Sequence, residues 1–171
     1  MRTLHASARC FLAVLLGACA NLQIPVPAGG AGTGTGVGGS PASIAADVIR
    51  YTNEARARNG VGPLATNARL TEAAQLHAQQ MAHYQRSDHT ISVAQYPTMQ
   101  ARLEAVGYAY SRAAENVAWN QRNAQEVVNT WMNSSGHRAN ILSPQLREIG
   151  AAMARSAKGE PYWIQVFGSP R

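Results

Sequence analysis

The chain has 171 residues, of which 46% are hydrophobic and 14% are charged, and its formal net charge is +6 at pH 7. That length suits one domain of about 130 residues once an export signal and a low-complexity stretch are set aside. Basic residues do not run together, which argues against a nucleic-acid partner and favours a solvated surface for the arginines, namely Arg50, Arg56, Arg58, Arg69, Arg86, Arg102, Arg112 and Arg122.

Residues 1–18 have the layout of a secretory signal peptide. Arg2 and Arg9 lie in the first nine residues, residues 10–18 are almost wholly apolar, and small residues precede Cys19. This apolar stretch is far shorter than the ~20 residues that span a bilayer, so we expect cleavage rather than a transmembrane helix. Removal of the signal leaves 13 basic against 9 acidic residues, a net charge of +4.

The end of this signal resembles the bacterial lipobox. Leu16-Gly17-Ala18-Cys19 has its pattern, which implies that Cys19 is acylated and anchors the chain in a membrane. The alternative is an ordinary signal that is cleaved near Ala18 or Ala20. Because no Asp follows Cys19, the resemblance implies outer-membrane sorting in a Gram-negative host. The other cysteine, Cys10, lies within the signal, so we expect no disulfide in the folded domain.

Residues 19–40 are expected to form a glycine-rich tether after the lipidated cysteine. From Pro25 to Ser40 the sequence reads PVPAGGAGTGTGVGGS, which has too few large apolar side chains to offset the entropy of ordering it. The pattern changes after Pro41. The folded domain is therefore expected to cover residues 41–171.

The first part of the domain predicts three helices. Apolar residues recur at helical spacing over residues 42–58, and Asn59-Gly60 follows as a left-handed stop. A second helix is expected after Asn67, with His77 on its apolar stripe. A third, short helix begins after Pro97 and ends at Gly107.

The second part of the domain predicts one helix and most of a sheet. Asn123 can cap a helix in which Glu126 reaches back to the cap amide, and Gly136 is expected to end it. Residues 148–155 and 162–168 predict a β-hairpin, and residues 114–119 predict a further strand. Helices on both sides of a small, mainly antiparallel sheet would give an α+β fold.

Four segments of the domain occur in an order that is typical of a known family. They are Tyr51–Arg56 with Asn59-Gly60 and Pro63-Leu64, then Ser87–Thr90, then Gly107-Tyr108 with Ala114–Ala118, and last Val127–Leu142 with Glu148–Gly150 and Tyr162–Gly168. They resemble the bacterial branch of the CAP superfamily: the cysteine-rich secretory (SCP-like), antigen 5 and pathogenesis-related proteins. The resemblance implies an α-β-α sandwich with a central cleft, in which two histidines and two acids converge, sometimes around a divalent cation.

The resemblance also indicates which residues form the site. His89 and His137 match the two histidines, and Glu115 matches the first acid. Ser134 stands where many members have the second acid. Glu126 is a candidate replacement, although its capping position is a sufficient structural reason for it.

Two chemical interpretations of this set remain open. Two neutral imidazoles and a carboxylate, with a water in the open position, suit zinc or a similar divalent cation. The alternative is an internal hydrogen-bond cluster that satisfies buried polar groups. A nucleophilic pair of Ser134 and His137 lacks an acid to orient the imidazole. His77 and His83 are expected to be packed or solvated side chains rather than ligands.

We therefore expect a non-catalytic module that binds a divalent cation, a small molecule or a lipid-like ligand at these residues. The alternatives are a metal-dependent hydrolase acting on peptide or cell-wall substrates, and a scaffold that binds an envelope protein. The expected location is the cell envelope, with the lipid on Cys19 in the outer membrane or periplasm, or secretion.

Overall fold

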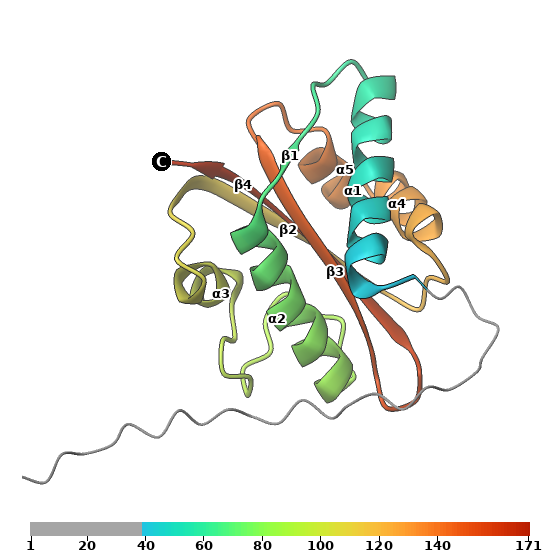
Figure 1. The fold of residues 1–171 in the computed structure, drawn as a ribbon, viewed down its shortest axis with the longest axis vertical. Helices are drawn as coiled ribbons and strands as arrows, with labels where there is room; N and C mark the ends of the chain where they lie inside the picture. Colours follow the sequence, from blue (N-terminus) through green and yellow to red (C-terminus); the bar gives the residue numbers. More distant parts are fainter. Residues whose placement is uncertain (1–38) are drawn as a thin grey trace, which may run out of the picture. The chain divides into compact units, whose positions relative to one another are not determined.

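A computed structural model describes residues 39–171 of the chain (Figure 1). The predicted signal peptide, Cys19 and the tether up to residue 38 lie outside the described residues. Within residues 39–171, no helix combines the length and the apolar character needed to cross a membrane.

The order of elements confirms most of the predicted ones. The helices are α1 (Pro41–Arg58), α2 (Ala68–Tyr84), α3 (Met99–Ala105), α4 (Ala124–Asn133) and α5 (Ser135–Ile141), and the strands are β1 (Ala65–Thr66), β2 (Tyr110–Trp119), β3 (Glu148–Arg155) and β4 (Pro161–Pro170). The side chain of Asn67 caps α2, and that of Asn123 caps α4. Gly60 and Gly107 take positive φ angles of 72° and 67° just after α1 and α3.

The four strands form one sheet in the order β1-β3-β4-β2. Strands β3 and β4 pair antiparallel as the predicted hairpin, and β4 pairs antiparallel with β2, whereas the short β1 runs parallel to β3. The order places β2 at an edge. Two carbonyls of β2 accept hydrogen bonds from side chains of α4 and α5: Val117 from Trp131 Nε1 at 3.0 Å and Glu115 from Asn140 Nδ2 at 3.3 Å.

Helices cover both faces of the sheet, which gives the expected α-β-α sandwich (Figure 1). One core packs α1, α4 and α5 on the sheet around Trp131 and Phe167. The other packs α2 and α3 on the opposite face around Met81 and Leu103. Gly150 of β3 permits a close approach, because a Cβ there would collide with the backbone of Leu70 in α2.

The end of the fourth predicted helix was wrong. Gly136 was expected to end it, but α4 ends at Asn133 and a separate helix, α5, begins at Ser135. Ser134 between them is extended, with φ −101° and ψ 123°, so the chain changes direction there. Gly136 lies inside α5, where a single glycine in the first turn is tolerated.

The solvated surface predicted for the arginines was wrong at two positions. Arg56 and Arg102 are only 2% and 1% exposed. The guanidinium of Arg56 donates to the carbonyls of Gly62, Ile141 and Ser143, which ties the end of α1 to the end of α5. A guanidinium has five donors in a fixed fork, so several carbonyls compensate its burial.

Candidate functional site

Strand β2 carries the acid of the predicted site. Side chains alternate along a strand, so Glu115 faces α2 and α3 while Asn116 faces α5. Glu115 is 6% exposed. The segment between α2 and α3 places His89 beside it, with His89 Nδ1 3.0 Å from Glu115 Oε1. An ionised carboxylate only accepts, so Nδ1 carries the hydrogen and Nε2 remains available.

Two further buried side chains lie beside this carboxylate, and one of them bonds to it. Arg102 of α3 donates from Nη2 to Glu115 Oε2 at 2.8 Å. His77 of α2 is fully buried, and its Nε2 lies 2.8 Å from the carbonyl oxygen of Asp88 and 3.8 Å from Glu115 Oε1. Neither was predicted as a site residue. His77 lies on the apolar stripe of its helix, which was a usable signal, whereas the sequence around Arg102 held none.

The charges of these groups stabilise one another. Burial would raise the pKa of the Glu115 carboxyl, but the hydrogen bond from His89 and the charge of Arg102 outweigh it and lower that pKa. The same hydrogen bond raises the pKa of His89. Burial lowers the pKa of His77, which is therefore held neutral. Glu115 is thus an ionised, fully engaged carboxylate at neutral pH.

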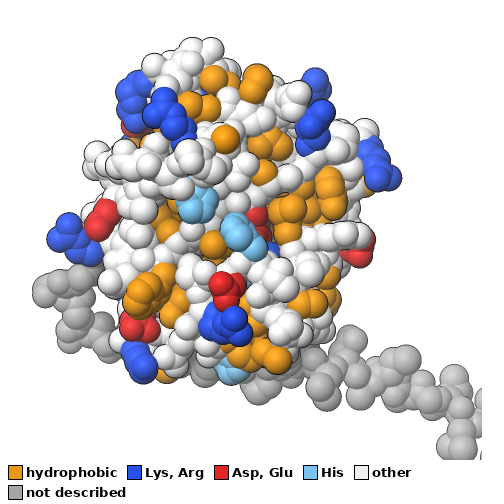
Figure 2. Space-filling model, turned by 180° about the vertical axis from the view of Figure 1, so that it is seen from behind, with side chains coloured by type: hydrophobic (Ala, Val, Ile, Leu, Met, Phe, Trp, Pro, Cys, Tyr) orange, Lys and Arg blue, Asp and Glu red, His pale blue; other side chains and the backbone are white. Residues whose placement is uncertain are grey.

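His137 approaches the same region from α5. Its backbone carbonyl accepts a hydrogen bond from Asn116 Nδ2 at 3.1 Å. Burial lowers the pKa of His137, and the charge of nearby His89 lowers it further. The side chain of His89 is 58% exposed, and Figure 2 shows histidine side chains grouped near the middle of one face of the molecule. We call His89, Glu115 and His137 the histidine site.

The other two candidates lie apart from this network. The carboxylate of Glu126 accepts from the backbone N–H and the guanidinium of Arg122, at 3.2 and 3.0 Å. These bonds lower its pKa. Its expected partner was the amide of Asn123, so the carboxylate reaches one residue further back. Ser134 joins α4 to α5 and is half-buried, and its side chain makes no capping bond to α5.

The donor set for a cation is smaller than the sequence predicted. In the described part of the chain, no group of three or more His, Cys, Asp or Glu side chains is arranged to hold a metal ion. Both oxygens of Glu115 are engaged by Arg102 and His89. The three-ligand site stays a prediction. The nitrogens still open to a ligand are Nε2 of His89 and those of the His137 ring.

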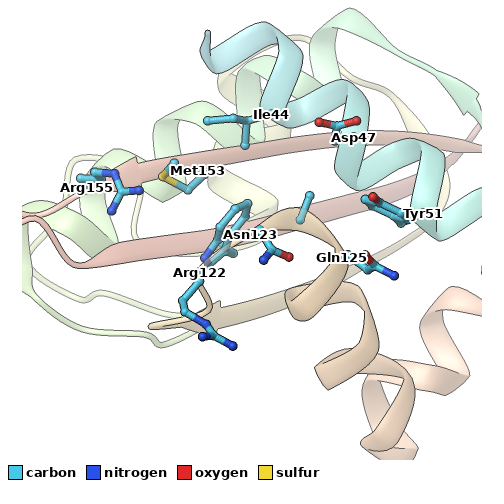
Figure 3. Close-up of a pocket in the computed structure, with 10 residues that line it drawn as sticks. Ile44, Asp47, Tyr51, Arg122, Asn123, Gln125, Met153 and Arg155 are labelled. Carbon is cyan, nitrogen blue, oxygen red and sulfur yellow. The ribbon is translucent and has the colours of Figure 1, made fainter. Parts of the chain in front are cut away.

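A separate pocket of about 220 Å³ lies on the other side of the sheet. Figure 3 shows residues that line it. They include Asp47 and Tyr51 of α1, the cap residue Asn123 and Gln125 at the start of α4, and Met153 of β3. Asp47 already pairs with Arg50, at 2.9 Å. The sequence predicted no site there.

Comparison with known proteins agrees with this architecture. The family model described as CAP, cysteine-rich secretory protein family, matches residues 49–167. The uncharacterized protein YkwD of Bacillus subtilis (strain 168) is 34% identical over 134 residues, which are 75% of this chain and 49% of YkwD. The chain therefore spans about half the length of this curated relative.

Two solved structures share the fold. An extracellular protein with an SCP domain from Bacillus anthracis is similar with a TM-score of 0.66 and 23% identity, over 75% of this chain and 41% of that one. An outer surface protein from Borrelia burgdorferi is similar with a TM-score of 0.65 and 20% identity, over 74% of this chain and 94% of that one. At these identities the likeness concerns the fold alone.

Proposed function

Because the chain belongs to the CAP, or cysteine-rich secretory protein, family, we propose that it is an exported module of the cell envelope that binds a ligand at the histidine site without catalysing a reaction. The similar proteins are described as extracellular or as outer surface proteins, which supports the location. The pattern of residues 1–19 supports it independently.

One observation carries the binding role: the hydrogen bond between His89 Nδ1 and Glu115 Oε1. A histidine that binds a ligand through one nitrogen commonly donates its other N–H to a carboxylate, which fixes the ring and its tautomer. Arg102 holds the same carboxylate in place. Buried groups thus orient the ring of His89, although the His89 side chain itself is 58% exposed to solvent.

The ligand that this arrangement suits is a divalent cation with a preference for nitrogen. Nε2 of His89 and the ring of His137 would hold it, and Glu115 would orient His89 instead of coordinating. Coordination requires a neutral imidazole. Burial lowers the pKa of His137 and favours that form, whereas the bond to Glu115 raises the pKa of His89, so a cation would displace a proton from His89 as pH falls. A bound cation would supply a fixed positive charge for a further anionic or lipid headgroup ligand.

Zinc titration of the full chain tests the site. Cys10 and Cys19 are first changed to serine, because thiolates would bind zinc on their own. We expect calorimetry to show one zinc site, and His89→Ala or His137→Ala to weaken it roughly tenfold or more. His83→Ala is the matched control, since His83 is an exposed histidine of α2. Equal zinc binding by the three variants, or none by the parent, would overturn the proposal.

The anchor is tested separately through its cysteine. In a Gram-negative host, the full chain should take up labelled fatty acid and fractionate with membranes, because acylation adds buried apolar area. Cys19→Ser should lose both properties, whereas Cys10→Ser, in the same segment, should keep them. Equal labelling of the two variants would show that Cys19 is not the acylated residue.

The lack of catalysis is supported by the place of the second acid. Ser134 stands at the position that the resemblance assigns to it, and Glu126 is engaged by Arg122. Hydrolysis needs a base placed to use a bound water, and no carboxylate of residues 39–171 other than Glu115 hydrogen-bonds to His89 or His137. Release of product from peptidoglycan or peptide by the wild-type protein, but not by His137→Ala, would favour the hydrolase instead.

A further inference from the structure

Four exposed arginines lie at one end of the sheet, where β4 ends and β2 and β3 begin. They are Arg69 of α2, Arg112 of β2, Arg147 just before β3 and Arg171 just after β4. The backbone N–H of Arg147 donates to the carbonyl of Gly168 on β4 at 3.0 Å, and Arg112 is paired with Ser169 of the same strand. Because neighbouring strands lie about 4.8 Å apart, the backbones of Arg112 and Arg147 are about 10 Å apart, on either side of β4. We call the four residues the arginine patch.

The other two arginines of the patch line a shared hollow of about 490 Å³ beside these strand ends. Arg69 Nη1 donates to the carbonyl of Gly107 at 2.6 Å, and Arg171 Nε donates to a carbonyl of β2 at 2.9 Å. The acid in this hollow, Glu148, accepts from the hydroxyl of Tyr108 at 2.6 Å. A guanidinium has five donors, so both arginines are held in place and still have donors for a partner.

The arginine patch differs from the other exposed arginines in its lack of counter-charges. Within residues 39–171, none of its four members forms an ion pair. The exposed arginines that do pair with an acid are Arg50, Arg58, Arg86 and Arg122. The members of the patch are far apart in the sequence, so no run of basic residues indicated it. A cluster of like charges without counter-charges attracts a partner of opposite charge.

The patch lies at the opposite end of the sheet from the start of α1. Ile44, in the first turn of α1, lines a pocket with Met153 and Arg155, which are at the hairpin end of β3. Strand β3 has eight residues, so its hairpin end and its patch end are about 24 Å apart. The chain therefore enters the described domain at one end of the sheet and presents the patch at the other, which favours a partner other than the membrane that would hold a lipid on Cys19.

From this arrangement we infer that the arginine patch is a docking surface for an acidic polymer of the cell envelope, one that presents carboxylates at intervals as the peptides of peptidoglycan do. A guanidinium binds a carboxylate through two parallel N–H···O bonds. Arginines from one helix and three strand ends can engage several carboxylates of one polymer. The surface is separate from the histidine site, and the inference uses only the proposed location in the envelope.

Sedimentation with purified peptidoglycan sacculi tests this surface. The full chain carries Cys19→Ser, so that no acyl group contributes to binding. Arg112→Gln combined with Arg147→Gln should bind about tenfold more weakly at low salt, because two guanidinium contacts are lost. Added NaCl should weaken binding of the parent, since exposed charges are screened. Arg155→Gln combined with Lys158→Gln is the matched control: it removes the same charge from exposed positions at the hairpin end and should bind as the parent does.

Three results would overturn the inference. The first is equal binding of sacculi by the two double variants, and the second is unchanged binding to sacculi whose carboxyl groups have been amidated. The third is a larger loss by Arg112→Gln with Arg147→Gln on vesicles of phosphatidylglycerol and phosphatidylcholine than on sacculi, which would make an anionic membrane the partner. Zinc titration of the same double variant should match its parent, so a failure of the patch and a failure of the histidine site are separate results.

Discussion

Glu115 and Asn116 are neighbours on β2, and each contacts a different histidine on a different face of the sheet. Glu115 accepts from the ring of His89, and Asn116 donates to the backbone carbonyl of His137. Residues that are distant in the sequence thus meet at two consecutive positions of one edge strand. Strand β2 therefore connects the segment that carries His89 to the helix that carries His137.

Asn116→Ala should therefore destabilise the packing of α5 on β2 and, with it, lower the zinc affinity of the histidine site. Asn116 is fully buried, donates to His137 and accepts from Asn140 Nδ2 at 2.9 Å. Alanine removes both of these hydrogen bonds to α5, and Asn140 Nδ2 keeps only its bond to the carbonyl of Glu115, so we expect the free energy of unfolding to fall by about 1–3 kcal/mol. Urea denaturation measures this loss, and zinc titration should show weaker binding in the same variant.

Asn129→Ala is the control for that substitution, because Asn129 lies exposed on α4. It should change the free energy of unfolding by no more than about 0.5 kcal/mol. If Asn116→Ala unfolds at the same urea concentration as Asn129→Ala, the amide contacts to α5 do not hold the site together.

The two histidines of the site should titrate on opposite sides of the ordinary value of about 6.5. The hydrogen bond to Glu115 raises the pKa of His89, whereas burial lowers that of His137. Imidazole resonances followed against pH by nuclear magnetic resonance should give the higher midpoint for His89. In Glu115→Gln the His89 midpoint should fall, because the acceptor loses its charge.

The same directions set how stability depends on pH. His89 has the higher pKa when folded, so its contribution is complete below about 6.5 and is lost as pH rises through the folded pKa. Glu115 has the lower pKa when folded, so its contribution is present above its unfolded pKa and is lost as pH falls through the folded one. The two contributions are therefore complete together between the unfolded pKa values of Glu115 and His89. Urea denaturation at several pH values should show this dependence reduced in Glu115→Gln.

Local signals were enough to predict most of the fold. Asn67 precedes a regular apolar stripe, and its side chain does cap α2, accepting from the N–H groups of Arg69 and Leu70. The hairpin followed from two apolar runs around a polar loop. The break at Ser134 was missed because no proline or other strong stop marks it, and the direction of α5 depends on its contacts with β2.

The candidate site was predicted as a set of residues and not as a network. The resemblance identified His89, Glu115 and His137, and the structure pairs the first two. No local pattern indicated that Arg102 would be buried, because its partner Glu115 is 13 positions away on another element. Burial of a charge depends on tertiary partners, which a stretch of neighbouring residues does not contain.

Trp131→Phe should show how much the hydrogen bond from Trp131 to the edge strand β2 contributes to stability. Trp131 is fully buried, and its Nε1 donates to the carbonyl of Val117 on β2 at 3.0 Å. Phenylalanine keeps most of the apolar contact and leaves that carbonyl without a donor, so we expect a loss of about 1–3 kcal/mol in urea denaturation. Trp163→Phe removes a bond to the half-buried carbonyl of Gln121 and should lose less. An equal loss in both variants would contradict a special role for the edge.

Two glycines should respond to alanine in opposite ways. At Gly150 of β3 an added methyl would collide with the backbone of Leu70 and Thr71. A helix backbone cannot relieve this collision by changing rotamer, as a side chain could. We expect Gly150→Ala to force α2 from the sheet and to lower the free energy of unfolding by about 3 kcal/mol.

Gly136 lies in α5 with nothing within 4 Å of the new methyl, so Gly136→Ala should raise stability by about 0.5 kcal/mol through helix propensity. Thermal and urea unfolding compare the two. A neutral Gly150→Ala would mean that α2 and β3 can separate without loss, which their close approach at this residue argues against.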